Sequence, residues 1–472
     1  MKASTRRRAR GLAAFAALFL TAASAITLTA ASPPEVVLFS DEDVSSFRGE
    51  FLEDGQGAFF DGSLVVSGDV TTLEPLAGLE EVAGDLTIEY ALVESLAGLE
   101  GVRSVGGSLE LRNNLDLADL RGLRNLRSVG GHLNIYVNGG LGSLEGLEGL
   151  ASVGGKLDVV ANDNLEDLRL GSLESVGGSL EVLDNFVLAS LEGLESLGRV
   201  GGNLYVNSNP MLASVAGLEA LQEVGGNFMI KNSPNLDSLL PLGRFSGIGG
   251  DFIVEDTGLT SLAGLESLSV GGSIWITKTL LPNLKGLGRP PAGTLNGSLI
   301  LVENPNLMSL DGLENLTSVE GKVDIISNEN LVSLEALGQL EEISGAAGMA
   351  MGLVPGTGGL TVRNNPEINE TLGLDQLQAI GGDLDVAFNP NLRDLGLPEL
   401  ETVDGFVAVV ANDRLMSLGL DSLETAGGPV TVIENGPILG FEISNGTGES
   451  LMMVTKRNAS AFRGGSTSAG DG

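Results

Sequence analysis

Few side chains in this sequence are of the types that carry out catalysis. The chain has no cysteine and one histidine, His132, so it can build neither a thiol nucleophile nor a metal site from cysteines or several histidines. Two carboxylates at equivalent positions, Asp324 and Asp385, are of the type that act as general acid and base in glycoside hydrolysis. With 62 acidic residues in the chain, however, such pairs arise by chance. We therefore predict that the protein is not an enzyme, and a carbohydrate-active enzyme is the weakest of three alternatives.

Glycine-rich and acidic motifs were considered for ligand chemistry. The recurrent Gly-Gly pairs are followed by neither a helix pattern nor Gly-Lys-Ser/Thr, so they are not phosphate loops. There is no Gly-x-Ser-x-Gly elbow with a plausible set of partners, and no Asp-x-Asp-x-Asp-Gly calcium loop with its glutamate. The sequence therefore predicts no cofactor and no dedicated metal site, and His132 is interpreted as an outward surface residue.

These residues sit on a repeat that occupies most of the chain. Seven successive units open with an aliphatic residue and Gly-Gly, at steps of 24, 24, 23, 24, 24 and 24 residues, beginning at Val105, Val129, Val153, Val176, Val200, Val224 and Ile248. A period in this range is typical of a solenoid in which each coil contacts mainly its neighbours. We count sixteen coils, which begin at about Phe60, Val82, Val105, Val129, Val153, Val176, Val200, Val224, Ile248, Val270, Leu295, Val319, Ile343, Ile380, Val403 and Ala426.

One coil illustrates how the spacing sets the local structure. From Asn203 to Asn207, apolar and polar residues alternate, which predicts a short strand with one buried face. From Leu212 to Leu221, every third residue is leucine or valine, which fits a polygonal coil with one inward side chain on each short side. The pair Gly201 and Gly202 is expected at a tight corner, because glycine reaches positive φ without a Cβ clash.

Asparagine recurs at one position after the strand. An inward amide stacked coil upon coil satisfies peptide groups in the turn that would otherwise be buried without partners. We therefore interpret these asparagines as scaffold and not as ligand-binding residues. They are Asn114, Asn138, Asn162, Asn185, Asn209, Asn304, Asn328, Asn365, Asn389, Asn412 and Asn435.

The segments outside the repeat predict four regions. Residues 1–31, with a basic start and an apolar run, are typical of a signal peptide, and an uncleaved membrane anchor is the alternative. Residues 32–59 are expected to cap the first coil, residues 60–443 to form the solenoid, and residues 444–472 to be a disordered Gly/Ser-rich tail. Within the solenoid, we expect a surface loop at 344–356 and a local bulge at 282–297.

Charge narrows the range of partners. The chain has 26 basic and 62 acidic residues, and removal of residues 1–31 leaves 21 basic residues and a net charge near −41. Such a surface argues against binding to nucleic acid or anionic membranes. We predict an extracellular, cell-surface or cell-wall protein. Sequons that matter only in a host that glycosylates secreted proteins occur at Asn296, Asn315, Asn369, Asn445 and Asn458.

The recurrent Val-Gly-Gly-x-Leu-x-Val-x-x-Asn-x-x-Leu-x-Ser-Leu-x-Gly-Leu-x-x-Leu, seen at 129–150 and 319–340, resembles the receptor L-domain type of leucine-rich repeat. That family includes L domains of insulin- and epidermal-growth-factor-type receptors and fungal cell-wall glycoproteins of the Ecm33/Sps2 type. The resemblance covers roughly residues 60 to 440 and implies a mostly β, right-handed β-helix-like solenoid of about sixteen coils of 22–25 residues. The chain lacks the cysteines and the kinase of the receptor members, so the cell-wall or cell-surface role is the nearer analogy.

Binding is expected on the outward positions of the strands. Five consecutive coils place an apolar or aromatic residue there, in a ladder roughly 20 Å long that includes the chain's only tryptophan. An exposed apolar stripe is a common mark of an interaction surface, whereas cross-strand packing is the alternative reading. We predict a recognition or adhesion module that binds a protein or glycan here, with a structural wall spacer as the alternative. The stripe consists of Tyr205, Met229, Ile253, Trp275 and Ile300.

Overall fold

The computed structural model describes residues 34–52, 59–288, 291–345 and 358–438. The predicted signal peptide (1–31), the predicted tail (444–472) and nearly all of the predicted surface loop therefore lie outside the described residues. Within those described ranges, no helix combines the length and apolar character needed to cross a bilayer.

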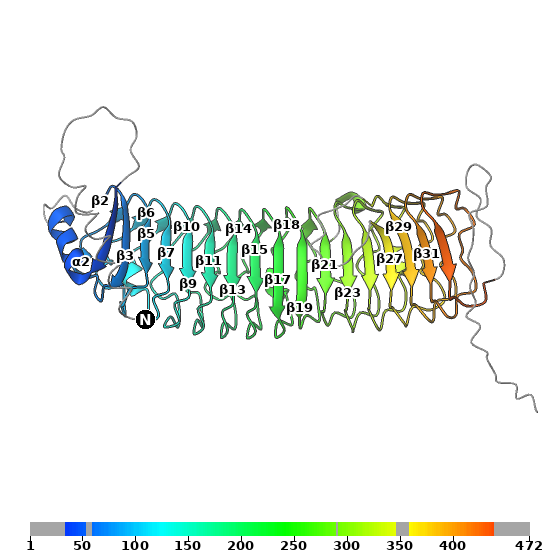
Figure 1. Cartoon of the computed structure of the whole chain (residues 1–472), viewed down its shortest axis with the longest axis horizontal. Coiled ribbons are helices and arrows are strands. Elements are labelled where there is room, and N and C mark those ends of the chain that lie inside the picture. Colours follow the sequence, from blue (N-terminus) through cyan, green and yellow to red (C-terminus); the bar gives the residue numbers. More distant parts are fainter. Residues whose placement is uncertain (1–33, 53–58, 289–290, 346–357, 439–472) are drawn as a thin grey trace, which may run out of the picture. The chain divides into compact units, whose positions relative to one another are not determined.

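The described residues form a stack of coils, each of which contributes one long and one short strand (Figure 1). The long strands pair in parallel with their equivalents in the next coil, and so do the short ones. The long strands form one seventeen-stranded sheet. They are β1 (Glu35–Ser40), β3 (Ser63–Asp69), β5 (Leu86–Glu89), β7 (Leu109–Arg112), β9 (Leu133–Tyr136), β11 (Leu157–Val160), β13 (Leu180–Leu183), β15 (Leu204–Asn207), β17 (Phe228–Ser233), β19 (Phe252–Thr257), β21 (Ile274–Thr277), β23 (Leu299–Val302), β25 (Val323–Ile326), β27 (Gly359–Arg363), β29 (Asp383–Ala387), β31 (Val407–Val410) and β33 (Val430–Ile433).

The short strands form a ten-stranded and a six-stranded sheet, which together mark sixteen coils. The ten are β2 (Phe59–Phe60), β4 (Glu81–Val82), β6 (Ser104–Val105), β8 (Ser128–Val129), β10 (Ser152–Val153), β12 (Ser175–Val176), β14 (Arg199–Val200), β16 (Glu223–Val224), β18 (Gly247–Ile248) and β20 (Ser269–Val270). The six are β22 (Thr294–Leu295), β24 (Ser318–Val319), β26 (Glu342–Ile343), β28 (Ala379–Ile380), β30 (Thr402–Val403) and β32 (Thr425–Ala426). The fold class, a mostly β solenoid of about sixteen coils, is confirmed.

The two short-strand sheets part between β20 and β22, within the segment where we expected an irregularity. A 3-10 turn, η5 (Pro291–Gly293), lies there, and Ala292 has a φ of 54°. Other single 3-10 turns replace part of the leucine side in four coils, at η2 (Glu74–Leu76), η3 (Arg121–Leu123), η4 (Leu240–Leu242) and η6 (Glu335–Leu337).

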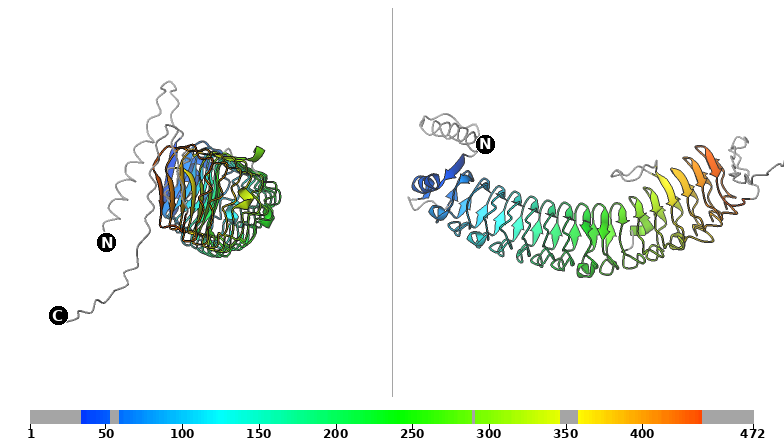
Figure 2. Two further views of the ribbon diagram at one scale, coloured as in Figure 1. Left: turned by 90° about the vertical axis from the view of Figure 1, so that its right-hand side faces the viewer. Right: turned by 60° about the horizontal axis from the view of Figure 1, so that its bottom comes forward.

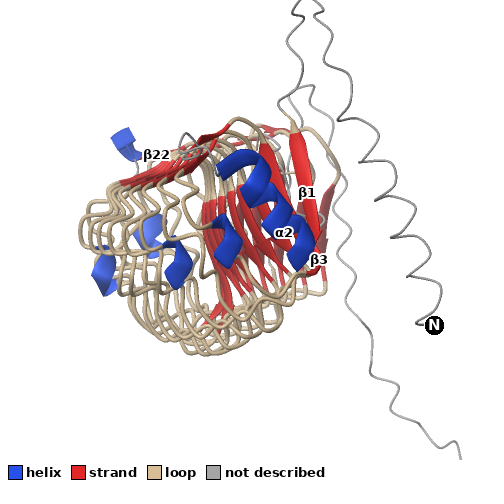
Figure 3. Cartoon of the chain, turned by 90° about the vertical axis from the view of Figure 1, so that its left-hand side faces the viewer, coloured by secondary structure: helices blue, strands red, loops and turns tan. Residues whose placement is uncertain are grey.

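At the N-terminal end, β1 pairs in parallel with β3, and helix α2 (Asp41–Phe47) follows it directly. Ser40 caps the helix by accepting a hydrogen bond from the Asp43 amide at 3.2 Å. Phe47 is buried against Phe60 with ring centroids 5.2 Å apart. The helix, continued by the π-helical turn η1 (Arg48–Leu52), lies against the first coil (Figure 3).

The core runs along the inside of the stack. In the coil taken as the example above, Leu204 and Val206 of β15 and the four residues Leu212, Val215, Leu218 and Leu221 are all buried, as the spacing of three predicts. Figure 2, whose left-hand view looks along the stack, shows that successive coils superpose. Each inward leucine is therefore covered by its equivalents in the coils on both sides.

A ladder of buried asparagines joins the coils, as predicted. The Asn162 side-chain oxygen accepts the Asn138 backbone N–H at 3.0 Å, and the Asn162 side-chain nitrogen donates to the Ile135 carbonyl at 3.0 Å. The same pattern repeats from Asn114 to Asn209 and from Asn304 to Asn435. Each of these amides thereby bonds peptide groups of the preceding coil.

The ladder is interrupted in three coils, where Ser233, Thr257 and Thr279 replace asparagine. The long strands β17 and β19 are extended to six residues in the first two of these coils. Buried phenylalanine rings pack in the same place, with the rings of Phe228 and Phe252 stacked at 5.7 Å.

We expected the glycine pair at a corner because glycine reaches positive φ, and this reason is wrong. Gly201 and Gly202 do not have positive φ. A Cβ on Gly201 would lie 2.1 Å from the carbonyl oxygen of Gly177 in the preceding coil. The pair is therefore required by the close approach of successive backbones, and the glycines with positive φ are others, such as Gly217 at 104° in the leucine side.

The residue before each ladder asparagine adopts the left-handed conformation, whatever its type. Val137 has a φ of 53° and its equivalent in the preceding coil, Asn113, has a φ of 57°. A β-branched residue is strained in this conformation, whereas asparagine tolerates it. The turn geometry is thus imposed by the stacked coils and not by the local sequence.

We predict that Asn162→Ala lowers the free energy of unfolding by about 3 kcal/mol, because two buried hydrogen bonds, with the Asn138 N–H and the Ile135 carbonyl, are lost. The matched control is Asn164→Ala, an exposed asparagine with one bond to the Gly139 carbonyl, and it should cost less than about 1 kcal/mol. Urea unfolding followed by circular dichroism measures both. Equal losses would contradict the structural role of the ladder.

We also predict that Val137→Asn raises the free energy of unfolding by about 1 kcal/mol, since it relieves left-handed strain at an exposed position. The reverse exchange in the preceding coil, Asn113→Val, should lower it by a similar amount. The same urea titration checks the pair, and a loss of stability in Val137→Asn would refute the interpretation.

Candidate binding face of the long sheet

The five residues of the predicted stripe lie side by side on the outward face of the long sheet. Tyr205 pairs with Met229, Met229 with Ile253, Ile253 with Trp275, and Trp275 with Ile300, each in register on neighbouring strands. The structure therefore brings together the residues that the alternation placed at equivalent positions.

Their expected exposure, however, is only partly observed. Met229, Ile253 and Ile300 retain 8%, 3% and 3% of their accessible surface, whereas Tyr205 and Trp275 are partly buried. With strands about 4.8 Å apart in register, each outward side chain is covered by its equivalents on both sides. The expectation that all five form an exposed apolar stripe is wrong, and Tyr205 and Trp275 are its accessible members.

Trp275 has a buried indole nitrogen with no hydrogen-bond partner among the described residues. Tryptophan N–H groups usually find a partner when they are buried. Beside the stripe, Lys231 of β17 and Glu255 of β19 form an ion pair at 3.0 Å. The stripe is thus bordered by two opposite charges that pair with each other, and it contains one hydrogen-bond donor, the Trp275 N–H, that has no acceptor among the described residues.

The two carboxylates considered for acid–base catalysis are not brought together. Asp324 and Asp385 are separated by the strand that carries Thr361, which places them about 10 Å apart along the sheet. Asp324 is ion-paired with Lys322 at 2.6 Å, and Asp385 is ion-paired with Arg363. Each carboxylate therefore has a cationic partner on its own or the adjacent strand.

The sequence analysis missed a polar cluster two coils before the stripe. Asp158 of β11 is 6% exposed, and its Oδ2 accepts a hydrogen bond from the Tyr136 hydroxyl at 2.6 Å. Its Oδ1 and the Oδ1 of Asn134, which is in register on β9, are both buried and have no hydrogen-bond partner among the described residues. An outward Asn-x-Tyr next to an outward Asp in the following coil is the only signal that the sequence carries for this arrangement.

Burial shifts the protonation equilibria of the two hydrogen-bonded side chains. Loss of solvation raises the pKa of the Asp158 carboxyl, and the negative charge of Glu181 raises it further, against the effect of the Tyr136 bond. Burial and the bond to Asp158 raise the pKa of the Tyr136 phenol well above its usual range. The cluster therefore keeps a carboxyl group in an environment that disfavours its charge.

His132, on the same face, is exposed as predicted. Its Nδ1 accepts the backbone N–H of Lys156 at 2.9 Å. In other coils, the residue equivalent to His132 also accepts a hydrogen bond from the next coil. Ser179 Oγ accepts the Asn203 N–H at 3.0 Å, and Asn203 Oδ1 accepts the Asn227 N–H at 2.8 Å. The histidine thus replaces a scaffold residue and has no catalytic partner.

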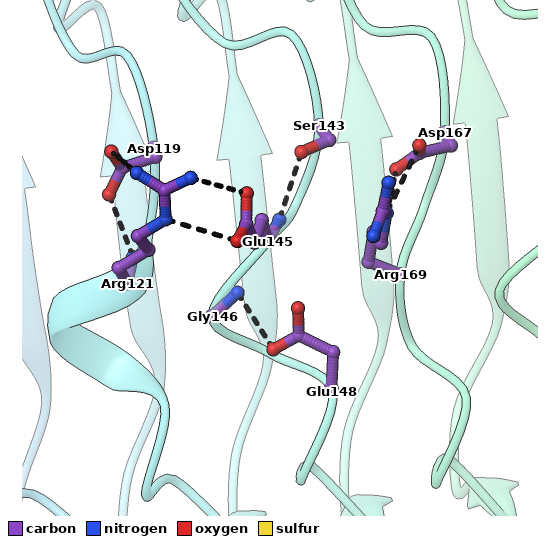
Figure 4. A network of polar contacts seen from close by, with 8 residues as sticks. All are labelled: Asp119, Arg121, Ser143, Glu145, Gly146, Glu148, Asp167 and Arg169. Atoms are coloured by element: carbon purple, nitrogen blue, oxygen red, sulfur yellow. Dashed lines mark hydrogen bonds and ion pairs between the residues drawn. The ribbon is translucent and has the colours of Figure 1, made fainter.

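A second polar network lies on the leucine side of the coils (Figure 4). Arg121 contacts Glu145 through two hydrogen bonds, of 3.0 and 2.9 Å, which lower the pKa of that carboxyl. Arg169 pairs with Asp167 at 3.0 Å. These arginines are exposed, so such pairs contribute little to stability.

Beside Arg169 is a shallow hollow of about 510 Å³ whose rim includes Glu148 and Glu195. Both of these glutamates accept the backbone N–H of a turn glycine, Gly146 and Gly193, at 2.9 and 2.8 Å. Glu148 and Glu195 are therefore engaged in the turns, and Asp167 is engaged with Arg169, which favours a structural role for the hollow.

Most exposed large apolar side chains occur at the turn that follows each long strand, which the sequence analysis also missed. Because the ladder asparagine of each coil points inward, the neighbouring apolar residues of the same turn can be recognised in the sequence as outward. The members of this strand-exit edge are Tyr90, Leu92, Leu115, Val137, Phe186, Val187, Met211, Leu280, Met308, Val332, Phe388 and Met416.

Three of the five sequons, at Asn296, Asn315 and Asn369, are at exposed positions, and those at Asn445 and Asn458 lie outside the described residues. Within the described ranges, no group of three histidine, aspartate or glutamate residues is arranged to hold a metal ion.

Comparisons with known proteins add little to this description. No family model matches the chain, and no curated protein matches it. Among solved structures, a crystal structure of a TLR13–ssRNA13 complex matches with 13% sequence identity and a TM-score of 0.28, over 79% of this chain and 78% of that chain. A score this low carries no argument, so the assignment of a leucine-rich β-solenoid rests on the coils themselves.

The Asp158 environment leads to a prediction about stability. A carboxyl whose pKa is raised in the folded state binds its proton more tightly there, so its contribution lowers the free energy of unfolding as the pH rises above its ordinary pKa of 3.8. Asp158→Asn removes the charge and places an N–H beside Asn134. It should raise the free energy of unfolding at pH 7 by about 1 kcal/mol, and the gain should shrink toward pH 4.

Urea unfolding of both proteins at the two pH values measures this difference. Asp163→Asn, at an exposed position in the same coil, makes the same change of charge and should have little effect. A lower stability of Asp158→Asn at pH 7 would show that the carboxylate is favourably placed, contrary to our interpretation.

Proposed function

We propose that this chain is a secreted or cell-surface recognition and adhesion module that binds an extracellular protein or glycan on the outward face of its long sheet. The observation that carries the proposal is Trp275, a partly exposed aromatic residue of the stripe whose indole N–H has no hydrogen-bond partner among the described residues. Tryptophan and tyrosine are the side chains most enriched at the centres of interfaces. Tyr205, the other accessible aromatic residue of the stripe, lies three strands away.

The extracellular location rests on the predicted signal peptide at 1–31, the absence of cysteine and the acidic surface. The motif's resemblance to receptor L domains and to fungal cell-wall glycoproteins of the Ecm33/Sps2 type supports the same class of function. A solenoid fold does not by itself fix a ligand. We propose a non-enzymatic role, because the candidate carboxylates Asp324 and Asp385 each have a basic partner and lie two coils apart.

One observation favours the alternative, a structural spacer without a specific ligand. Met229, Ile253 and Ile300 are nearly as buried as the core, so the ladder stabilises the sheet without a partner. In that reading, Tyr205 and Trp275 only extend the packing. Self-association of the protein, measured by sedimentation and unchanged by substitutions on the stripe, would favour the spacer.

We predict that Tyr205→Ala combined with Trp275→Ala reduces retention on the binding fraction of a surface extract by about tenfold or more, since aromatic hot-spot residues dominate binding energy. The extract is taken from the organism's own outer surface and separated into polysaccharide and protein. Bound and free protein are measured for each fraction, and the fraction that retains the wild type identifies the ligand class.

The matched control is Phe186→Ala combined with Met211→Ala, which removes exposed apolar side chains from the strand-exit edge. Loss of binding in this control alone would move the binding surface to that edge. If both double variants and the wild type behave alike, the stripe is not a site and the spacer is the better assignment.

A further inference from the structure

The pair formed by Asn134 and Asp158 has hydrogen-bonding capacity that the described part of the chain does not use. The two residues are in register on β9 and β11, and both project from the outward face of the long sheet. The Oδ1 atom of each is buried and has no hydrogen-bond partner among the described residues. The two side chains project from adjacent strands whose backbones are about 4.8 Å apart, so a ligand that satisfies both acceptors needs more than one N–H donor.

Such a pair is costly for the folded protein alone. A buried acceptor without a partner loses its hydration and gains nothing in return. An asparagine at position 158 would supply the missing donor to Asn134, as asparagines do in the internal ladder. A carboxylate at this position therefore favours a role in contact with a donor from outside the chain.

The charges around the pair indicate what kind of donor fits. In the same row of outward positions, Glu110 is in register with Asn134 and Glu181 with Asp158, so the two glutamates flank the pair. The nearby cations are already engaged, because Lys156 lies 3.1 Å from Glu181, and Arg112 lies 2.8 Å from Glu89 and 3.4 Å from Glu110. The cluster keeps an excess of negative charge, within a chain whose net charge is −36. The complementary ligand carries several N–H donors and a positive charge.

Other occupants fit less well. Anionic groups are repelled, and sugar hydroxyls supply donors without compensating the charge. An ammonium group has three donors, whereas a guanidinium has five in a planar fork and is less strongly hydrated, which suits a partly buried site. Tyr136 is partly exposed and donates a hydrogen bond to the second oxygen of Asp158, so its side chain orients the carboxylate.

We propose that Asn134 and Asp158 form a binding site for an arginine side chain of a basic protein partner, with Tyr136 as the residue that positions Asp158. The site is two coils from Tyr205 and does not depend on the aromatic stripe. If the arginine site were disproved, the proposed function would stand. If the stripe were shown not to bind, the arginine site would stand.

The experiment measures binding of capped arginine amide to the full chain by ligand-observed NMR at low salt. We expect saturable binding to the wild type and to Asp163→Asn, and binding to Asp158→Asn that is weaker by about tenfold or more, because a charge-assisted hydrogen bond is lost. Capped citrulline amide, which is neutral and nearly the same shape, should not bind. Urea unfolding of Asp158→Asn verifies that the loss is not caused by unfolding.

Several results would overturn the proposal. An equal loss in Asp158→Asn and Asp163→Asn would mean that only the diffuse acidic surface attracts the probe. Tighter binding of capped lysine amide, or of a neutral disaccharide, would assign the pair to a different ligand. Guanidinium ion that binds as tightly as arginine within a neutral Gly-Ser peptide would exclude a protein as the source of the group.

Discussion

The close stacking of coils on one another is the constraint on which the rest of the structure depends. At a separation of about 4.8 Å, successive backbones leave no room for a Cβ at the corner, and Gly177 and Gly201 meet there directly. The same separation lets the Asn162 amide reach two peptide groups of the preceding coil. Glycine pairs, amide ladder and parallel strands are thus three consequences of one distance.

This arrangement separates what the chain needs for folding from what it can offer to a partner. Inward leucines and asparagines fix the coil, whereas the outward strand positions vary from Asn134 and Asp158 to Met229 and Trp275. Even there, each side chain touches its equivalents in both neighbouring coils, so the outward face stabilises the sheet as well. A binding role is therefore sought in groups whose polar atoms the stack leaves unsatisfied.

The architecture could be predicted from sequence because it repeats. Coil starts, inward leucines and scaffold asparagines such as Asn162 follow from spacing alone. The reason for Gly201 could not be predicted, since it depends on the backbone of another coil. Alternation showed that Ile253 points outward, but it did not show that its neighbours cover it. The bond between Tyr136 and Asp158 was missed because it joins different coils and rows, which single-coil periodicity does not compare.

Because the amide ladder is interrupted, different regions of the stack are stabilised by different interactions. From Ser233 to Thr279, hydroxyl side chains stand where amides serve the flanking coils, and the rings of Phe228 and Phe252 stack in the core of the first two of these coils. Burial of apolar surface stabilises less as the temperature falls. We therefore expect cooling to weaken the central coils, whose strands carry Met229, Ile253 and Trp275, more than the coils on either side.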